Sequence, residues 1–351
     1  MNRTVTVAAT LLLVIMTGFL LVQGRGLLMP IIIALFIWHL VNTINQGIRA
    51  LPLAGARMPH WLSLLCALLV LVMLARLVFD ILGSNINQVI AAAPRYQENL
   101  LSLFNRLDER LHIRAFANVD AFLENLSVQS IVLNVYGVFT SLASSAVLIA
   151  LYVVFLFVEQ HFFWQKIRLL FAKKGHLRVV NNIISHIVRD TQTYLGIKTL
   201  VSAVTAVASW SIMKAVGLDF AEFWALLIFF LNFIPNIGAI IATAFPALLA
   251  MVQFDGGLPF LAVSLGIISV QFVIGNLIEP RFMGKSLNVS PLAILFALTL
   301  WGAIWGVLGM FLSVPITVML MIVCAHFEKT RPIAVLLSQD GHIYKAYEEI
   351  A

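Results

Sequence analysis

The sequence predicts an all-α protein that crosses a membrane several times. Of its 351 residues, 61% are hydrophobic and only 11% are charged, and the mean hydropathy is +1.00. An ordinary soluble domain carries about 25% charged residues, so this chain has too little polar surface to face water on all sides. Its apolar residues also form runs of about 20, the length a helix needs to cross a bilayer. This composition excludes a disordered chain, a disulfide-stapled secreted domain and a free nucleic-acid-binding protein.

Six apolar runs are long enough to be membrane-spanning helices. They cover residues 5–23, 26–44, 61–82, 136–158, 197–217 and 258–278. The first run lacks a small-residue cleavage site, so we expect it to be retained as a span and not removed as a signal peptide. Cys66 and Cys324 lie inside apolar runs without a C-x-x-C spacing, which predicts packing residues and no metal or redox site.

Three other apolar segments, all in the C-terminal half, have the wrong length for a perpendicular span. Residues 221–235 and 237–253 make helices of about 22 and 25 Å, and residues 291–323 would make one of about 50 Å. We therefore predict two short helical hairpins broken by Pro or Gly, over residues 221–253 and 291–323, beside about eight other helical segments. Both fully crossing and re-entrant hairpins fit the sequence. The tip of the second hairpin is expected among Gly302, Gly306 and Gly309.

The distribution of basic residues predicts the orientation of the chain. Fifteen of the 22 Lys and Arg residues fall on one side of the predicted spans and six on the other, with Arg76 inside a span. Basic loops remain cytoplasmic, so both termini are expected in the cytoplasm. The predicted parts are three spans in 1–82, an extracytoplasmic amphipathic helical segment in 83–130, a fourth span in 131–158, a basic cytoplasmic amphipathic helical segment in 159–196, a transport core in 197–325 and a cytoplasmic tail in 326–351.

The sequence carries no motif of an enzyme, a metal site or a cofactor site. The eight histidines include no pair at four-residue spacing and no H-E-x-x-H. Gly284-Lys285-Ser286 copies the end of a phosphate-binding loop, but the glycine required five positions earlier is Glu279. No G-x-S-x-G occurs, and no acidic pair lies inside a span. We predict a protein that is not an enzyme and has neither a metal nor a cofactor.

The first hairpin contains polar residues and helix breakers at membrane depth. Interrupted helices of this kind often form the substrate site of a transporter, because they free backbone amides and carbonyls for a ligand. The alternative is a plain interfacial turn. The substrate-path candidates here are Asn232, Pro235, Asn236 and Gly238.

A second polar cluster lies at the end of the 258–278 run. Gln271 and Asn276 are uncharged polar groups that would bridge helices or line a polar path. Pro280 is expected to force the chain out of helix, leaving its neighbours to pair with each other or with a mobile partner; the alternative is a simple helix stop at the inner headgroups. Lys198 opens a span and is either an anchor or a gating contact. The gating or coupling candidates are Lys198, Glu279, Pro280, Arg281 and Gly284.

Two long motifs resemble a known family. The runs LNFIPNIGAIIATAFPALLA (231–250) and GNLIEPRFMGKSLNVSPLAILFALTLWGAIWGVLGMFLSVPITVMLMI (275–322) are similar to those of the bacterial autoinducer-2 exporter family, as are the order of spans and YLGIKT at 194–199. The resemblance covers most of the chain. It implies a multi-pass permease of the bacterial inner membrane, a homo-oligomer with five copies, and export of a small polar solute such as the quorum-sensing molecule autoinducer-2 by alternating access. The functional residues it carries over are Asn232, Pro235, Asn236, Gly238, Asn276, Glu279, Pro280, Arg281 and Gly284.

Three functions therefore stand as hypotheses. The leading one is an exporter of a small polar organic solute, because Asn side chains and freed carbonyls suit a hydroxyl-rich ligand better than a bare ion. The second is a sodium/proton antiporter, which needs a titratable carboxylate held at depth; Glu279 would be the candidate. The third is a non-transporting membrane scaffold, which leaves the broken helices unexplained.

Overall fold

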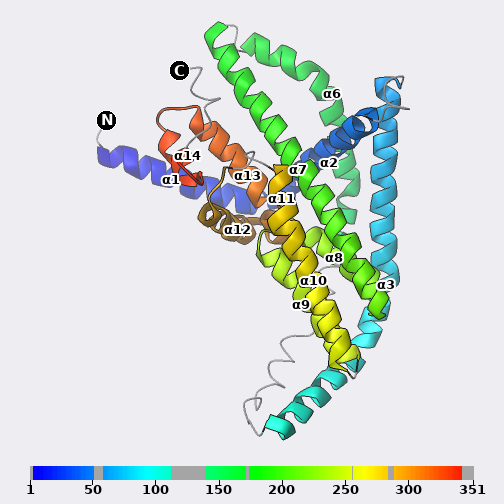
Figure 1. Cartoon of the computed structure of the whole chain (residues 1–351). Coiled ribbons are helices and arrows are strands. Elements are labelled where there is room, and N and C mark those ends of the chain that lie inside the picture. Colours follow the sequence, from blue (N-terminus) through cyan, green and yellow to red (C-terminus); the bar gives the residue numbers. More distant parts are fainter. Residues whose placement is uncertain are drawn as a thin grey trace. The chain divides into compact units, whose positions relative to one another are not determined.

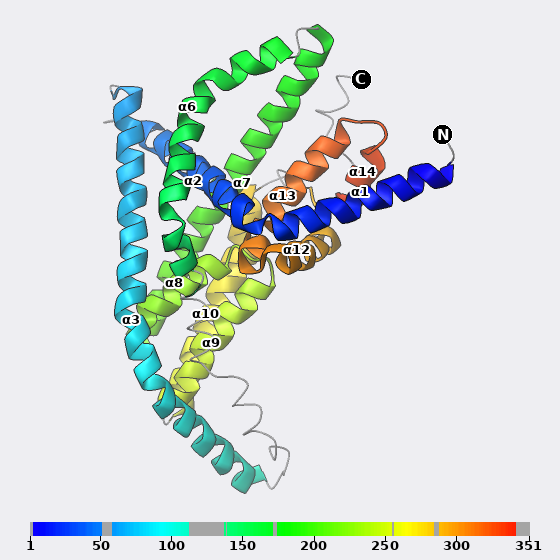
Figure 2. The same ribbon diagram turned by 180° about the vertical axis from the view of Figure 1, so that it is seen from behind.

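The protein is almost entirely helical. The computed structural model describes residues 3–50, 58–111, 137, 139–170, 174–254, 256–283 and 288–341, and Figures 1 and 2 show the helices from two sides. Within these ranges the one β contact is an isolated bridge between Val289 and Ser338. The prediction of an all-α fold is confirmed.

The helices follow the apolar runs of the sequence. In chain order they are α1 (Arg3–Gln23), α2 (Arg25–Ala50), α3 (His60–Leu111), α6 (Ala146–Leu170), α7 (Lys174–Val216), α8 (Ala221–Leu231), α9 (Ile237–Gln253), α10 (Gly257–Val273), the π-helix η3 (Ile274–Ile278), α11 (Glu279–Met283), α12 (Pro291–Trp305), α13 (Val307–Ala325) and α14 (Arg331–Leu337).

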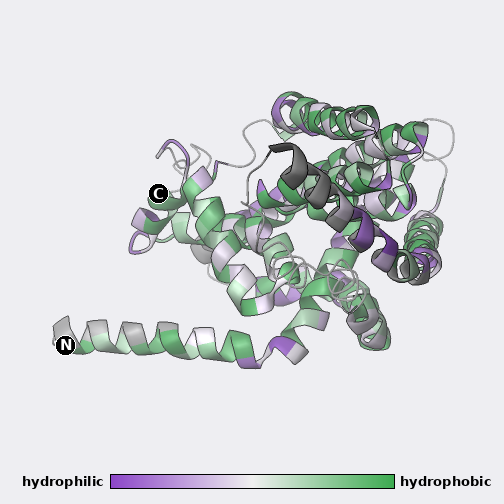
Figure 3. Cartoon of the chain, turned by 90° about the horizontal axis from the view of Figure 1, so that it is seen from below, coloured by the Kyte–Doolittle hydropathy of each residue, from purple (hydrophilic) through white to green (hydrophobic). Residues whose placement is uncertain are grey.

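Six helical segments of the described chain are long and apolar enough to cross a membrane. They are Arg25–Ala50, His60–Asn85, Ala146–Leu170, Val179–Val216, Gly257–Met283 and Val307–Ala325. Large hydrophobic side chains such as Met73 and Phe272 are exposed on them, and much of the helical ribbon in Figure 3 has the green of hydrophobic residues. A polytopic membrane protein is confirmed. The predicted first span forms α1 but is not among these six, so its crossing stays a prediction.

Two helices extend well beyond the expected spans. α3 has 52 residues, about 78 Å, and joins the 61–82 run to the following amphipathic segment as far as Leu111. α7 has 43 residues, about 65 Å, and likewise joins the inner amphipathic segment to the 197–217 run. No Pro separates the apolar and amphipathic parts of either helix, so helical hydrogen bonding continues across the change of pattern. Residues 112–136 lie outside the described part of the chain.

The chain divides into two compact units. Unit 1 is Met1–Leu64, Ser145–Ile197 and Met283–Ala351, and unit 2 is Leu65–Ser144 and Lys198–Phe282. The first short hairpin, α8 and α9, belongs to unit 2, and the last one, α12 and α13, to unit 1. The transport core proposed for 197–325 therefore draws on both units and remains a prediction.

The core of unit 2 surrounds α8. Phe223, Trp224 and Ile228 of this short helix are buried together with Met213 of α7 and Ile267 of α10. α9 packs along α10, and both views show the two side by side (Figures 1 and 2). A helix of 11 residues has too little apolar surface to be stable alone, so neighbouring helices hold it in place.

The second half of α3 is fastened to the hairpin of unit 2 by polar contacts. The Tyr96 hydroxyl donates to Asp219 at 2.7 Å, and the Asn99 amide donates to the carbonyl oxygen of Val252 at 3.2 Å. Burial, together with the hydrogen bond to Asp219, raises the pKa of the Tyr96 hydroxyl above its ordinary value. Tyr96 therefore stays protonated, and a donor, throughout the physiological pH range.

The last hairpin turns at Gly306, as the sequence predicts. Gly306 separates α12 from α13 with φ 66° and ψ −145°, a conformation open essentially to glycine alone. A Cβ atom on Gly309 would overlap the carbonyl oxygen of Trp301, whereas one on Gly302 would meet side-chain atoms of Met310, with Cε at 2.9 Å and Cγ at 3.0 Å. The glycines thus allow the two helices of the hairpin to pack closely.

We predict that Gly309→Ala destabilises the hairpin more than Gly302→Ala does. The new methyl group at residue 309 meets rigid backbone, so we expect the free energy of unfolding to fall by about 1–3 kcal/mol. At residue 302 the Met310 side chain can move aside. Thermal unfolding of both variants in detergent checks this. Equal melting temperatures for the two variants would contradict it.

Candidate functional site

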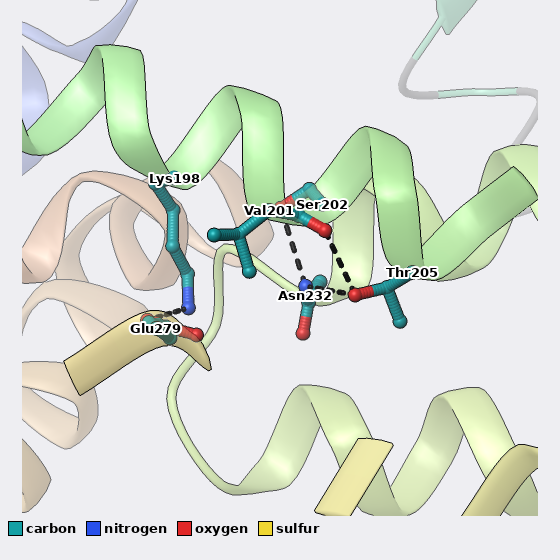
Figure 4. Close-up of polar contacts among 6 residues, drawn as sticks. All are labelled: Lys198, Val201, Ser202, Thr205, Asn232 and Glu279. Carbon is teal, nitrogen blue, oxygen red and sulfur yellow. Dashed lines mark hydrogen bonds and ion pairs between the residues drawn. The ribbon is translucent and has the colours of Figure 1, made fainter. Parts of the chain in front are cut away.

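The turn of the first hairpin is fixed to α7 by Asn232. The Asn232 Nδ2 group donates to the hydroxyl oxygens of Ser202, at 3.3 Å, and Thr205, at 3.5 Å (Figure 4). Thr205 in turn donates to the carbonyl oxygen of Val201 at 2.8 Å. Asn232 is 8% exposed, and both hydroxyl residues are fully buried. The amide oxygen of Asn232 points away from α7 in Figure 4 and makes no hydrogen bond within the described residues.

The backbone after Asn232 is strained at one residue. Asn236 has φ 57° and ψ −58°, the geometry of a classic γ-turn, and the Ile237 amide donates to the carbonyl oxygen of Pro235 at 2.6 Å. Gly238 is buried, and a Cβ there would overlap the carbonyl oxygen of Leu231. The Asn236 side chain is exposed and makes no hydrogen bond in the described chain. Pro235, Asn236 and Gly238 thus shape the turn, while Asn232 carries its inward contact.

Lys198 and Glu279 form an ion pair within unit 2. Lys198 Nζ lies 2.6 Å from Glu279 Oε1, and the two side chains are 8% and 18% exposed (Figure 4). The described residues of Leu65–Ser144 and Lys198–Phe282 contain two other ion pairs, and both are far more exposed: Arg76 with Asp80, at 83% and 69%, and Lys214 with Glu222, at 58% and 39%. Charges this well removed from solvent interact strongly and are costly to separate.

The expectation that Pro280 ends the helix is wrong. The chain stays helical from Gly257 to Met283, because the π-helix η3 precedes the proline. The Glu279 amide donates to the carbonyl oxygen of Ile274, five residues earlier, and this wider turn accommodates Pro280 without a break. Glu279 is consequently held on a continuous helix, one residue after η3.

The ion pair lies near one end of an antiparallel helix contact. Lys198 meets Glu279, and 14 residues later on α7 Ile212 packs against Gly266, 13 residues earlier on α10. α7 and α10 therefore run antiparallel for about 21 Å between these points. Lys198 lies about 27 Å before the end of α7, and Glu279 about 33 Å after the start of α10. The pair is thus one bilayer thickness from the far end of both helices.

The remaining predicted residues are not brought to this pair. Asn276 is exposed and donates to the carbonyl oxygen of Phe272 on its own helix turn. Arg281 is exposed and does not pair with Glu279. Gln271 lies on the more buried side of α10, with Nε2 buried and unpaired among the described residues. Gly284 lies outside the described residues.

Sequence reasoning missed the hydroxyl residues of α7. Lys198, Ser202, Thr205 and Ser209 recur at intervals of four, three and four, so they form one face of the helix, here called the polar face. All four residues are at most 7% exposed. Their spacing inside an apolar run was visible in the sequence, but Ser and Thr commonly bond to their own helix backbone, so spacing alone did not reveal an inward role.

Several helices long enough to span a bilayer, together with a short helical hairpin that turns at the buried Asn232, are features of a multi-pass membrane transporter. Comparison with known proteins gives the family. The chain matches the family described as "AI-2E family transporter" over residues 10–329, and it belongs to that family. It is a transport protein of the bacterial inner membrane, and its family is one of transporters.

Several relatives align over nearly their whole length. The chain is 30% identical over 336 residues to the AI-2 transport protein TqsA of Escherichia coli, covering 93% of this chain and 95% of the relative. It is 28% identical over 319 residues to a putative transport protein of Haemophilus influenzae, covering 89% and 90%. A putative permease of Escherichia coli, PerM, is 24% identical over 324 residues, covering 89% and 91%.

We predict that Lys198 and Glu279 stabilise the fold only as a pair. Lys198→Met or Glu279→Gln leaves one poorly solvated charge without its partner, and each should cost about 3–5 kcal/mol of unfolding free energy. The double variant should recover most of that loss, because neither charge remains. Thermal unfolding of all four proteins in detergent measures the coupling, and Arg76→Met provides an exposed control. Strictly additive losses would contradict a coupled pair.

Proposed function

We propose that this protein exports a small, hydroxyl-rich organic solute, with autoinducer-2 as the first candidate, by alternating access. The observation that carries the proposal is the Asn232 side chain. It lies at a helix break and is held by two buried hydroxyls, and its amide oxygen faces away from them and makes no hydrogen bond within the described residues. The name of the Escherichia coli relative, an AI-2 transport protein, supports the choice of solute.

The groups around Asn232 are uncharged donors and acceptors. A carboxamide and two hydroxyls can exchange hydrogen bonds with a polyol or a carbonyl compound, whichever way its hydroxyls point. They offer no full negative charge to replace the hydration shell of a cation. This chemistry favours a neutral, oxygen-rich solute over a bare ion.

The Lys198–Glu279 pair has the properties of a gate at one end of the solute path. It joins α7 to α11 with one charge from each, so the two helices separate only when the pair is broken or exchanged for water. A contact of this kind gives two discrete arrangements, closed and open, as alternating access requires. We place Lys198 and Glu279 as gating residues and Asn232 as the solute-contact residue.

The orientation and assembly also form part of the proposal. The excess of basic residues in loops assigned to the inner side supports cytoplasmic termini. With this orientation the Lys198–Glu279 gate lies at the cytoplasmic mouth of the solute path. The resemblance to the exporter family supports a homo-oligomer of five copies. Exposed apolar side chains on the six candidate spans provide surface for both lipid and neighbouring copies.

We predict that autoinducer-2 uptake into inverted membrane vesicles falls at least tenfold in Asn232→Ala. Loss of one or two hydrogen bonds to a buried solute accounts for a change of this order. The matched control is Asn276→Ala, whose amide bonds only to its own helix and whose loss should leave the rate near wild type. Equal rates for wild type and Asn232→Ala would reject Asn232 as a contact residue, and no uptake by wild type would reject this solute.

The sodium/proton antiporter is the second candidate, since Glu279 is a titratable carboxylate shielded from solvent. Its ion pair with Lys198 satisfies that carboxylate within the protein, which favours a gating role. We predict that Glu279→Gln alters solute uptake while leaving any pH-driven sodium flux in proteoliposomes unchanged. Loss of sodium flux in this variant, with solute uptake absent in wild type, would make the antiporter the better description.

A further inference from the structure

Unit 2 contains buried polar atoms that the contacts described above do not use. Four side-chain atoms in its described part are buried and have no hydrogen-bond partner: Ser209 Oγ on α7, Trp224 Nε1 on α8, and Ser264 Oγ and Gln271 Nε2 on α10. A buried donor without a partner costs free energy, and native proteins retain few of them. Several in one unit therefore call for an explanation.

Ser209, like Ser264, differs from other hydroxyl residues of unit 2. Thr205, Ser211 and Ser269 all donate to the carbonyl oxygen four residues earlier, the usual way in which a helical hydroxyl is satisfied. Ser209 is fully buried and makes no such bond. Its hydroxyl is the last member of the polar face of α7, one turn beyond Thr205.

The antiparallel register places another of these atoms close to the same level. With Lys198 opposite Glu279 and Ile212 opposite Gly266, Ser209 is level with residues 268–269 of α10. Gln271 is two or three residues away, about 3–5 Å along the helix axis. Ser209 and Gln271 thus supply a hydroxyl and an amide donor at one level, beyond Asn232 as seen from the ion pair.

We propose that Ser209, with Gln271, forms a second solute-contact station on the polar face of α7, which takes up the hydroxyl and carbonyl groups of the solute after Asn232. This inference rests on the proposed solute-transport function and extends it along the path. The two groups stay unpaired when the helices are closed, and they gain partners from the solute or from water when the helices open. The two unpaired groups raise the free energy of the closed state and so reduce the free-energy difference between the closed and open states.

Cysteine accessibility tests the station without reference to the identity of the solute. In a background with Cys66 and Cys324 replaced by serine, Ser209→Cys should react with a small hydrophilic methanethiosulfonate in membrane vesicles, although residue 209 is fully buried in the closed structure. The control is Met213→Cys, one turn further on α7 and equally buried but within the apolar core. Reaction at 209 and none at 213 is the expected result. An unreactive cysteine at 209, or equal reaction at both, would overturn the proposal.

Ser209→Ala supplies a second readout that a purely structural role would not reproduce. Removing an unpaired buried hydroxyl should leave the melting temperature unchanged or raise it, because no hydrogen bond is lost. Autoinducer-2 uptake should nevertheless fall about three- to tenfold, the ratio set by one ordinary hydrogen bond. Ser211→Ala, two residues away on the exposed side and bonded to its own helix, should leave uptake unchanged.

The two proposals can fail separately. Uptake that is lost in Asn232→Ala but normal in Ser209→Ala would keep the solute-transport function and reject the second station. Reaction of Ser209→Cys in a protein that does not carry autoinducer-2 would keep a hydrated path along α7 and reject the solute.

Discussion

A bilayer offers no water to a backbone amide or carbonyl, and this constraint governs where the chain can leave the α-helix. Within the described residues it departs in three ways inside apolar sequence: the turn at 232–236, the π-helix at 274–278 and the glycine turn at 306. Each departure satisfies backbone groups locally. The turn keeps bonds such as that from Ile234 to Leu231, and η3 keeps the bond from Glu279 to Ile274.

These departures also position the polar side chains. The turn at 232–236 ends α8 so that Asn232 can reach the hydroxyls of α7, and the strained γ-turn at Asn236 redirects the chain into α9 at once. The π-helix shifts the register of the helix just before Glu279, which meets Lys198. In both places a backbone irregularity lies next to a buried polar contact, as expected where local strain is tied to function.

The polar face of α7 connects these contacts. Lys198 holds the ion pair, Ser202 and Thr205 hold Asn232, and Ser209 Oγ has no hydrogen-bond partner in the described part of the chain. A helix that buries four polar groups along one face loses packing stability compared with an apolar one, since each group must find a partner or remain unsatisfied. A solute that supplies such partners during transport gives this arrangement a physical reason.

The sequence by itself determined the all-α membrane-spanning class, the positions of the apolar helices and a hairpin tip among Gly302, Gly306 and Gly309. It also identified Asn232, Lys198 and Glu279 as polar residues in apolar surroundings. Composition and periodicity are local properties, so they could be read without coordinates. The continuity of α3 and α7, the π-helix that accommodates Pro280 and the partner of each polar group were decided only by tertiary structure. Which side chains meet depends on helix register across 81 residues for Lys198 and Glu279, and 30 for Asn232 and Ser202. That register is set by packing between helices, about which a local pattern carries no information.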